Sequence, residues 1–355
     1  MTQPNQSFFF ASGYATAEQP GIQSFLFDEA TGKITTHGSF TGIDTPSFIV
    51  VHPNRQHVYA VSETGKDSHG ALGEVWAFHF EREPFSLRPL NHQSSRGDWP
   101  CHLQLDATGR WLLATNYGTG SAGIYPLQFD GSIGEMTDFV QHHGTGPNAA
   151  RQEGPHAHSS IFTPDNRFAI VADLGIDQLI IYQFDTATGK LVAYSAVNTR
   201  PGAGPRHLAF HPNGKWMYAA NELDSTVTLY DYDAANGALL ERQSLPTLPS
   251  ASPENIVADI HVSTSGQRVY VSNRGHNSIA VYDVRQDGSL VLVSIPACGG
   301  NWPRNFALAP GGRFMLVANQ YSNEVCVLPI IEGMEALGAP VERAKVAGAS
   351  CIQFV

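Results

Sequence analysis

Short apolar stretches alternate with turns rich in Gly, Pro, Asp and Asn along the whole chain, and one arrangement of them recurs. Its clearest copy is GPRHLAFHPNGKWMYAANE, residues 204–222, in which an alternating segment, a turn and a second apolar segment follow one another. Alternation with a period of two residues is typical of β-strands. Similar stretches begin at Trp99, Gly154 and Asn301, and weaker copies begin at Thr45 and Ile256.

Each copy continues into two further segments that resemble strands. A third segment, rich in β-branched and aromatic residues, begins at Gln178, Ser225, Asn277 and Asn323 in four of the units. A shorter fourth segment follows a turn, as near Gly189 and Gly288. The units start roughly 46 to 55 residues apart, a spacing typical of propeller blades. Each unit is therefore predicted to be a four-stranded meander.

Six such units are visible, and the two ends of the chain supply a seventh. FFFASGY and IQSFLFD near the N-terminus are typical of a second and a third strand, and SCIQFV from Ser350 supplies the first strand. A blade shared by both ends leaves no free sheet edge. We predict an all-β fold in one domain over residues 1–355: a seven-bladed β-propeller with four-stranded antiparallel blades, closed by the terminal strands, and almost no helix.

Composition agrees with a large folded core and excludes several classes of function. Hydrophobic residues make up 42% of the chain and charged residues 15%, and the net charge is -11. Without a basic cluster, no nucleic-acid partner is expected. The N-terminal segment has neither a basic start nor a long apolar run, so no signal peptide and no membrane contact are predicted. The four cysteines form no CxxC pair, which favours reduced thiols in the cytoplasm.

Two positions of the repeat change their chemistry from unit to unit, which is where function can be added to a scaffold. The first lies six residues before the turn Pro or its equivalent, and is Ser47, Cys101, His158, Arg206, Ala258 and Arg304. The second closes the following strand, and is Glu63, Tyr117, Leu174, Glu222, Arg274 and Gln320. In a propeller both positions open on the same mouth of the central channel.

A positive pocket is expected where these positions meet. Several cations from different blades would face few carboxylates, in a protein that is otherwise acidic, so the pocket should take an anionic ligand. Glu222 is the leading candidate for a general acid or base, with His158 as the second. Arg206 and Arg274 complete the predicted catalytic group, although both can also be plain ion-pair partners of Glu222.

Further residues near the same mouth are expected to contact the substrate: Arg304, His156, His207, His276, Asn273 and Gln320. Packing is the alternative role for most of them, and an Asx turn is the favoured role of the position that Asn273 shares with other units. The HxH pair of His156 and His158 is a weak metal signal, and we expect neither a metal nor a cofactor. No GxSxG, phosphate-binding loop or dinucleotide fingerprint is present. The pattern carries no indication of the oligomeric state.

These motifs resemble the bacterial 6-phosphogluconolactonase family of seven-bladed propellers, which includes the fungal carboxy-cis,cis-muconate cyclase. The similarity covers nearly the whole chain and is carried by GPHAHSS, GPRHLAFHPNGKWMYAANE, SNRGHNSIAVYDV and NWPRNFALAPGGRFMLVANQ. The family's proposed site of a His, an Arg, a Glu and a second Arg matches His158, Arg206, Glu222 and Arg274. The resemblance implies metal-free hydrolysis of an anionic sugar lactone, such as 6-phosphoglucono-1,5-lactone, as in the pentose phosphate pathway.

Three alternatives remain open at this point. A carboxymuconate cycloisomerase of the same family would also use the arginines, for a polyanionic muconate. A propeller without catalytic activity would bind a protein or another ligand. A calcium-dependent gluconolactonase would need inward oxygen ligands, for which Glu63, Asn116, Asp173 and Asn221 are candidates.

Overall fold

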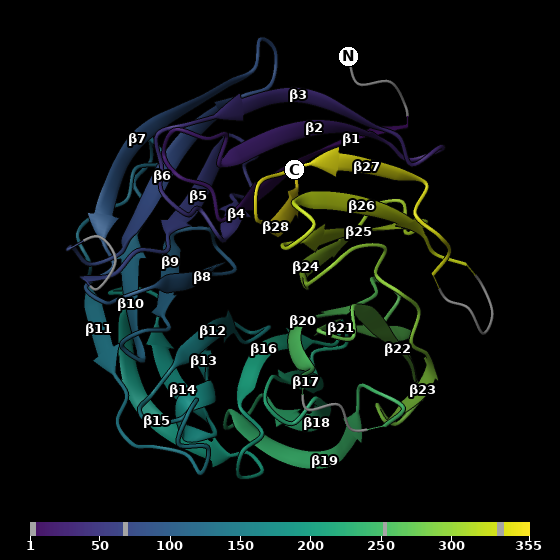
Figure 1. The fold of residues 1–355 in the computed structure, drawn as a ribbon. Coiled ribbons are helices and arrows are strands. Elements are labelled where there is room, and N and C mark those ends of the chain that lie inside the picture. The colour runs from purple at the N-terminus through teal and green to yellow at the C-terminus, as the bar shows by residue number, and fades with distance from the viewer. Residues whose placement is uncertain (1–4, 67–69, 251–253, 332–336) are drawn as a thin grey trace.

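Seven antiparallel sheets of four strands form a ring (Figure 1), and cavities open at its central channel. The structure is a computed structural model that describes residues 5–66, 70–250, 254–331 and 337–355. In six of the sheets the chain starts at the innermost strand and proceeds outwards, one antiparallel strand at a time, whereas the C-terminal strand β28 is the innermost strand of the seventh. The predicted seven-bladed all-β propeller is confirmed.

Each blade consists of four strands, given in order from the channel outwards. The blade that joins both ends contains β28 (Ala349–Phe354), β1 (Gln6–Gly13), β2 (Ile22–Asp28) and β3 (Ile34–Phe40). The next contains β4 (Ile49–Val51), β5 (His57–Ser62), β6 (Glu74–Glu81) and β7 (Ser86–Ser94). The third contains β8 (Pro100–Leu105), β9 (Trp111–Asn116), β10 (Ser121–Pro126) and β11 (Asp138–Gln141).

The other four blades follow the same order. They contain β12 (Ala157–Phe162), β13 (Phe168–Asp173), β14 (Gln178–Asp185) and β15 (Lys190–Asn198), then β16 (Pro205–Phe210), β17 (Trp216–Asn221), β18 (Thr226–Asp233) and β19 (Ala238–Pro246). The last two contain β20 (Ile256–Val262), β21 (Arg268–Arg274), β22 (Ser278–Val284) and β23 (Leu290–Ser294), then β24 (Pro303–Leu308), β25 (Phe314–Asn319), β26 (Glu324–Pro329) and β27 (Glu342–Lys345).

Burial is most complete in the second strands and is low in an outermost strand such as β15. Every residue of the second strands β5, β9, β13 and β25 is buried, because each strand is covered on both faces by neighbouring blades. The fourth strand β15 exposes most of its residues, as an outer edge does. The predicted second strands are accordingly the most uniformly apolar segments of each repeat.

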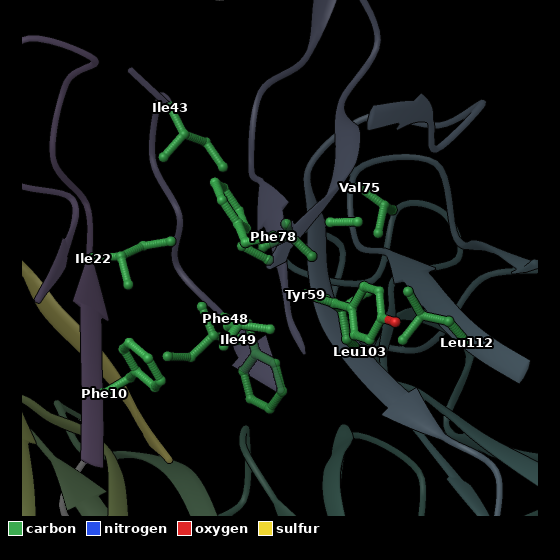
Figure 2. Packing of buried hydrophobic residues seen from close by; sticks show 14 of the residues in the cluster. Phe10, Ile22, Ile43, Phe48, Ile49, Tyr59, Val75, Phe78, Leu103 and Leu112 are labelled. Carbon is green, nitrogen blue, oxygen red and sulfur yellow. The ribbon is translucent and has the colours of Figure 1, made fainter. Parts of the chain in front are cut away.

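The hydrophobic core lies between adjacent blades. In one cluster, Phe10 of β1 packs with Tyr59 of β5 and Leu103 of β8, so side chains from three successive blades share one apolar layer (Figure 2). Since burying apolar surface drives folding, each blade is stabilised by its neighbours and the ring behaves as one packed unit.

The two ends of the chain close the ring as predicted. Strand β28 pairs with β1 in antiparallel register, with Phe354 opposite Phe9 and Ile352 opposite Ala11. In Figure 1 the yellow β28 accordingly lies beside the purple β1. The Ser350 hydroxyl also donates a hydrogen bond to the Ser47 carbonyl (2.7 Å), which links the closing strand to the next blade.

A 3₁₀ helix, η1 (Leu174–Ile176), follows β13. Across the part of the chain that the structure describes, no helix is long and apolar enough to span a membrane.

Candidate active site

In four blades a β-bulge lies at the start of the innermost strand, and the bulged residue is the first variable position of the repeat. In β16 the ladder pairs Pro205 with Asn221 and then His207 with Ala220, so Arg206 is left out of the register. His158 in β12, Arg304 in β24 and Cys101 in β8 are skipped in the same way. Because a bulge bends its strand and re-aims a side chain, these residues leave the pleat at the channel mouth.

The second variable position lies at the same mouth, because the end of each second strand pairs with the start of the first. Glu222 directly follows β17, whose last residue pairs with the first residue of β16. Arg274 ends β21 and lies opposite Ile256, the first residue of β20. The two positions recognised in the repeat therefore meet in space.

A cavity of about 240 Å³ forms between them. It is lined by Glu63, Trp99, Cys101, Tyr117, Arg151, His158, Glu222, Ile256, Arg274 and Arg304. Together with Arg206, which lies beside Cys101 and Arg304 in a small adjoining void, the site holds four arginines and two glutamates. Two positive charges therefore remain uncompensated, in a chain whose net charge is -11.

Glu222 is held by three of the arginines. Its Oε2 accepts hydrogen bonds from Arg206 Nε (2.9 Å) and Arg274 Nη2 (2.5 Å), and its Oε1 accepts one from Arg151 Nη2 (2.5 Å). Burial acts to raise the pKa of Glu222, but Arg274, Arg206 and Arg151 outweigh it and lower that pKa to about 2. The carboxylate is thus ionised and is a weak proton acceptor at neutral pH.

Arg206 and Arg274 are both buried, and backbone carbonyl groups fix them in addition to Glu222. Arg206 Nη1 donates to the Ala258 carbonyl (2.6 Å), and Arg274 Nη2 donates to the Val257 carbonyl (2.9 Å). Burial, with the neighbouring Arg274 and Arg304, lowers the pKa of Arg206 to about 9. These two guanidinium groups are therefore rigidly placed cations, which suits stabilisation of a developing negative charge.

Arg151 and Arg304 are the more accessible cations. The Arg151 side chain is 35% exposed, and its Nη2 also donates to the Tyr117 hydroxyl (3.3 Å). Arg304 lies 5.0 Å from the centre of the Tyr14 ring and forms no ion pair or hydrogen bond with any described residue. A guanidinium group without an anionic partner is free to bind an anion that enters the cavity.

His158 is a neutral imidazole in this surrounding. Burial lowers its pKa well below 6.5, and Arg206 and His207 lower it further. Its Nδ1 lies 3.7 Å from the Cys101 sulfur, whereas its Nε2 has no hydrogen-bond partner among the described residues. His158 lines the cavity, where its Nε2 can accept a hydrogen bond from a ligand or a water molecule in the tautomer that carries the proton on Nδ1.

The other residues predicted to contact the substrate are placed less directly. His156 stacks on Tyr117 (ring centres 4.5 Å apart) and bonds to the Tyr117 carbonyl, so it supports a lining residue. His207 pairs with Asp259 (2.7 Å) deeper in the channel. His276 bonds to Ser278. None of these three histidines lines the 240 Å³ cavity.

Asn273 and Gln320 also lie outside the lining of this cavity. Asn273 is fully buried, and its amide accepts a hydrogen bond from the hydroxyl of Thr247, which follows β19 of the neighbouring blade (2.7 Å), and donates one to Ser278 of its own blade (3.2 Å). Gln320 Oε1 is buried without a hydrogen-bond partner among the described residues. The structure therefore brings His158, Arg206, Glu222, Arg274 and Arg304 together, and leaves the other five candidates at its margin.

The oxygen ligands that a calcium site would need are not brought together. Asn116 donates to the Ser121 hydroxyl (3.0 Å), and Asn221 donates to the Thr226 hydroxyl (2.8 Å), each within its own blade. Asp173 accepts from the Gly175 backbone amide (3.0 Å). The hydrogen bonds of these three side chains stabilise strand ends and turns. Of the four candidates, only Glu63 lines the cavity.

A second cavity of about 550 Å³ occupies the opposite end of the channel, where it is lined by residues such as Leu105, Phe210 and Val262 from the far ends of the innermost strands. Its lining contains Asp106 and Asp259 but no arginine or lysine. An anionic substrate is therefore favoured only at the mouth that carries the arginines.

Comparisons with known proteins agree with this architecture. The model of the family described as "Lactonase, 7-bladed beta-propeller" matches residues 8–354. The chain is 33% identical over 313 residues to a protein of Bacillus subtilis named 6-phosphogluconolactonase, covering 88% of this chain and 87% of that one. A protein of the same name from Formosa agariphila is 32% identical, covering 89% and 90%.

Solved structures show the same relationship. A putative 6-phosphogluconolactonase from Bacteroides fragilis superimposes with a TM-score of 0.92 at 29% identity, covering 100% of this chain and 99% of that one. A periplasmic gluconolactonase of Pseudomonas aeruginosa gives 0.91 at 28% identity, covering 99% of both chains. The predicted cytoplasmic location of this chain thus stays a prediction. Family match, fold and relatives agree that the chain belongs to the lactonase family of seven-bladed β-propellers.

Proposed function

We propose that this lactone-hydrolysing enzyme opens 6-phosphoglucono-1,5-lactone to 6-phosphogluconate, without a metal. The observation that carries this proposal is the surplus of positive charge in a small cavity, with Arg304 unpaired among the described residues. At about 240 Å³ the cavity lies below the range of roughly 300–1,000 Å³ typical of drug-sized ligands, which favours a substrate as small as one sugar ring. The relatives named above are gluconolactonases, so lactone opening is preferred to muconate cyclisation.

In this mechanism the accessible arginines bind the phosphate of the substrate. Arg304 has no hydrogen-bond partner among the described residues, and the Arg151 side chain is 35% exposed. The buried pair, Arg206 and Arg274, binds Oε2 of Glu222 whereas Arg151 binds Oε1, and the positive charge of this pair can stabilise the oxyanion of the tetrahedral intermediate. Glu222 fixes the positions of three guanidinium groups and remains ionised throughout.

His158 then carries the proton. A water molecule attacks the carbonyl carbon of the lactone while His158 Nε2 takes one of its protons. The intermediate collapses with cleavage of the bond between the carbonyl carbon and the ring oxygen, and the ring oxygen receives the proton from His158 and leaves as a hydroxyl group. Binding of an anion among the arginines favours this step, because it offsets the charges that lower the pKa of His158.

Replacing Arg304 by glutamine tests the phosphate contact. We expect the KM for 6-phosphoglucono-1,5-lactone to rise about 10- to 100-fold, since hydrogen bonds to charged groups contribute roughly that factor. The KM for unphosphorylated glucono-1,5-lactone should rise less, because that substrate has no phosphate that Arg304 could contact. Steady-state kinetics on both lactones, corrected for spontaneous hydrolysis, measure the difference.

The matched control is Arg313→Gln, in the exposed turn between β24 and β25 of the same blade. This variant should keep the KM of the native protein for both lactones. Equal KM values for Arg304→Gln and the native protein would remove Arg304 from the phosphate site.

A further inference from the structure

Glu63 is the second carboxylate of the cavity, and its partners differ from those of Glu222. Its Oε2 accepts hydrogen bonds from the Tyr14 hydroxyl (2.7 Å) and from the Ser47 hydroxyl. Its Oε1 accepts none from any described residue, and Glu63 forms no ion pair with a described arginine, although it lines a cavity that contains several. One carboxylate oxygen of Glu63 is therefore left for the ligand.

The two glutamates stand on opposite walls. Glu63 follows β5 and Glu222 follows β17, and the blades of these strands are three places apart in the ring of seven. Three places is the largest separation that such a ring allows, and Figure 1 shows β5 and β17 on different sides of the channel. A ligand in the cavity thus lies between an arginine-bound carboxylate and one that is bound only by hydroxyl groups.

Hydroxyl donors fix the position of Glu63, which also attracts the Arg304 guanidinium group electrostatically without forming an ion pair with it. Ser47 and Tyr14 both donate to the same oxygen, and burial raises the pKa of Tyr14, so the phenol keeps the proton that it donates. A carboxylate in this state only accepts hydrogen bonds. The ligand group next to it must therefore be a donor, and a second anionic group placed there would be repelled.

We propose that Glu63 is a specificity-determining residue, whose free Oε1 accepts a hydrogen bond from a hydroxyl group of a sugar substrate and disfavours polycarboxylates. This proposal rests on the proposed function, because it assigns the hydroxylated part of the same anionic substrate to this wall. The arginines then select for one anionic group, and Glu63 selects against further ones. A pocket with both features fits a phosphorylated sugar lactone better than a substrate with three carboxylates.

Binding of two stable ligands to Glu63→Gln tests this assignment without turnover. Glucose 6-phosphate offers hydroxyl groups and one phosphate, whereas tricarballylate offers three carboxylates and no hydroxyl group. We expect the Kd of glucose 6-phosphate to rise about 10- to 100-fold, because a hydrogen bond to a charged acceptor is weakened. The Kd of tricarballylate should fall, because a repulsive charge is removed. Isothermal titration calorimetry measures both.

Opposite shifts of the two Kd values distinguish a role of Glu63 in recognition from a general distortion of the site, because a distorted site would raise the Kd of both ligands. Glu63→Asp keeps the carboxylate but places it farther from the ligand, because the side chain is shorter. The Kd of glucose 6-phosphate should therefore rise, while tricarballylate should still bind poorly. Glu81→Gln, at the exposed end of β6 in the same blade, is the control and should change neither Kd. Shifts in the same direction, or no shift, would overturn the role of Glu63. Opposite shifts in a protein that hydrolyses no lactone would contradict the proposed function and leave this recognition standing.

Discussion

Replacing His158 by glutamine is expected to lower kcat/KM for 6-phosphoglucono-1,5-lactone by about 10²- to 10⁴-fold, the usual contribution of a positioned general base. The amide cannot take the proton of the attacking water, while the arginines that bind the substrate remain in place. The KM should therefore change little in comparison with kcat. Measurement of acid release at fixed pH, corrected for spontaneous hydrolysis, gives both constants.

The pH dependence adds a second test of His158. Because burial and the arginines hold its pKa well below 6.5, the native imidazole should stay unprotonated at pH 6.5. The kcat/KM of the native protein should thus be flat from about pH 8 to 6.5 and fall only at lower pH. His143→Gln, at an exposed residue, is the control and should behave as the native protein does. Activity of His158→Gln within a few-fold of the native value would remove the general-base role.

Replacing Glu222 by glutamine is expected to lower both activity and stability. Three guanidinium groups lose their shared carboxylate, so we expect kcat/KM to fall on the order of 10³-fold through misplaced arginines. Breaking a buried ion pair from one side costs about 3–5 kcal/mol of unfolding free energy. Chemical denaturation and steady-state kinetics on the same preparation measure the two effects.

The stability effect of Glu222 should depend on pH in a defined direction. Its pKa is lowered from 4.5 to about 2 in the folded protein, so the ionised carboxylate stabilises the fold above pH 4.5, and this stabilisation is lost as pH falls towards 2. The native protein should lose about 3 kcal/mol more over this window than Glu222→Gln does. Glu222→Asp keeps the charge and should retain most of the pH dependence. Equal pH dependence of the native protein and Glu222→Gln would contradict the arginine clamp.

Much of the fold could be predicted because its signal is local and repeated. Alternation of apolar and polar residues marks each strand, and the spacing of the copies indicates blades. The closing blade could be predicted from FFFASGY and SCIQFV because each segment is a strand in its own right, and β1 and β28 pair as expected. Such patterns specify which residues face the neighbouring blades.

The candidate site was predictable only in part. The repeat marked His158, Arg206 and Arg304 by their position, but not the bulges that turn these side chains into the channel. Arg151 lies in the segment between β11 and β12, outside the repeated strands, and nothing in its spacing indicates that it reaches Glu222. The sequence pattern also suggested Glu222 as the leading base, whereas its three arginine partners favour a positioning role and leave His158 to carry the proton.

The most direct test of this account is the rate of acid release from 6-phosphoglucono-1,5-lactone at constant pH, with and without the purified protein. We predict an excess over spontaneous hydrolysis that is proportional to protein concentration, saturates with substrate and persists after exhaustive treatment with a metal chelator. Carboxymuconate tested in parallel should not be consumed. A rate equal to the spontaneous one at every protein concentration would contradict the proposed function.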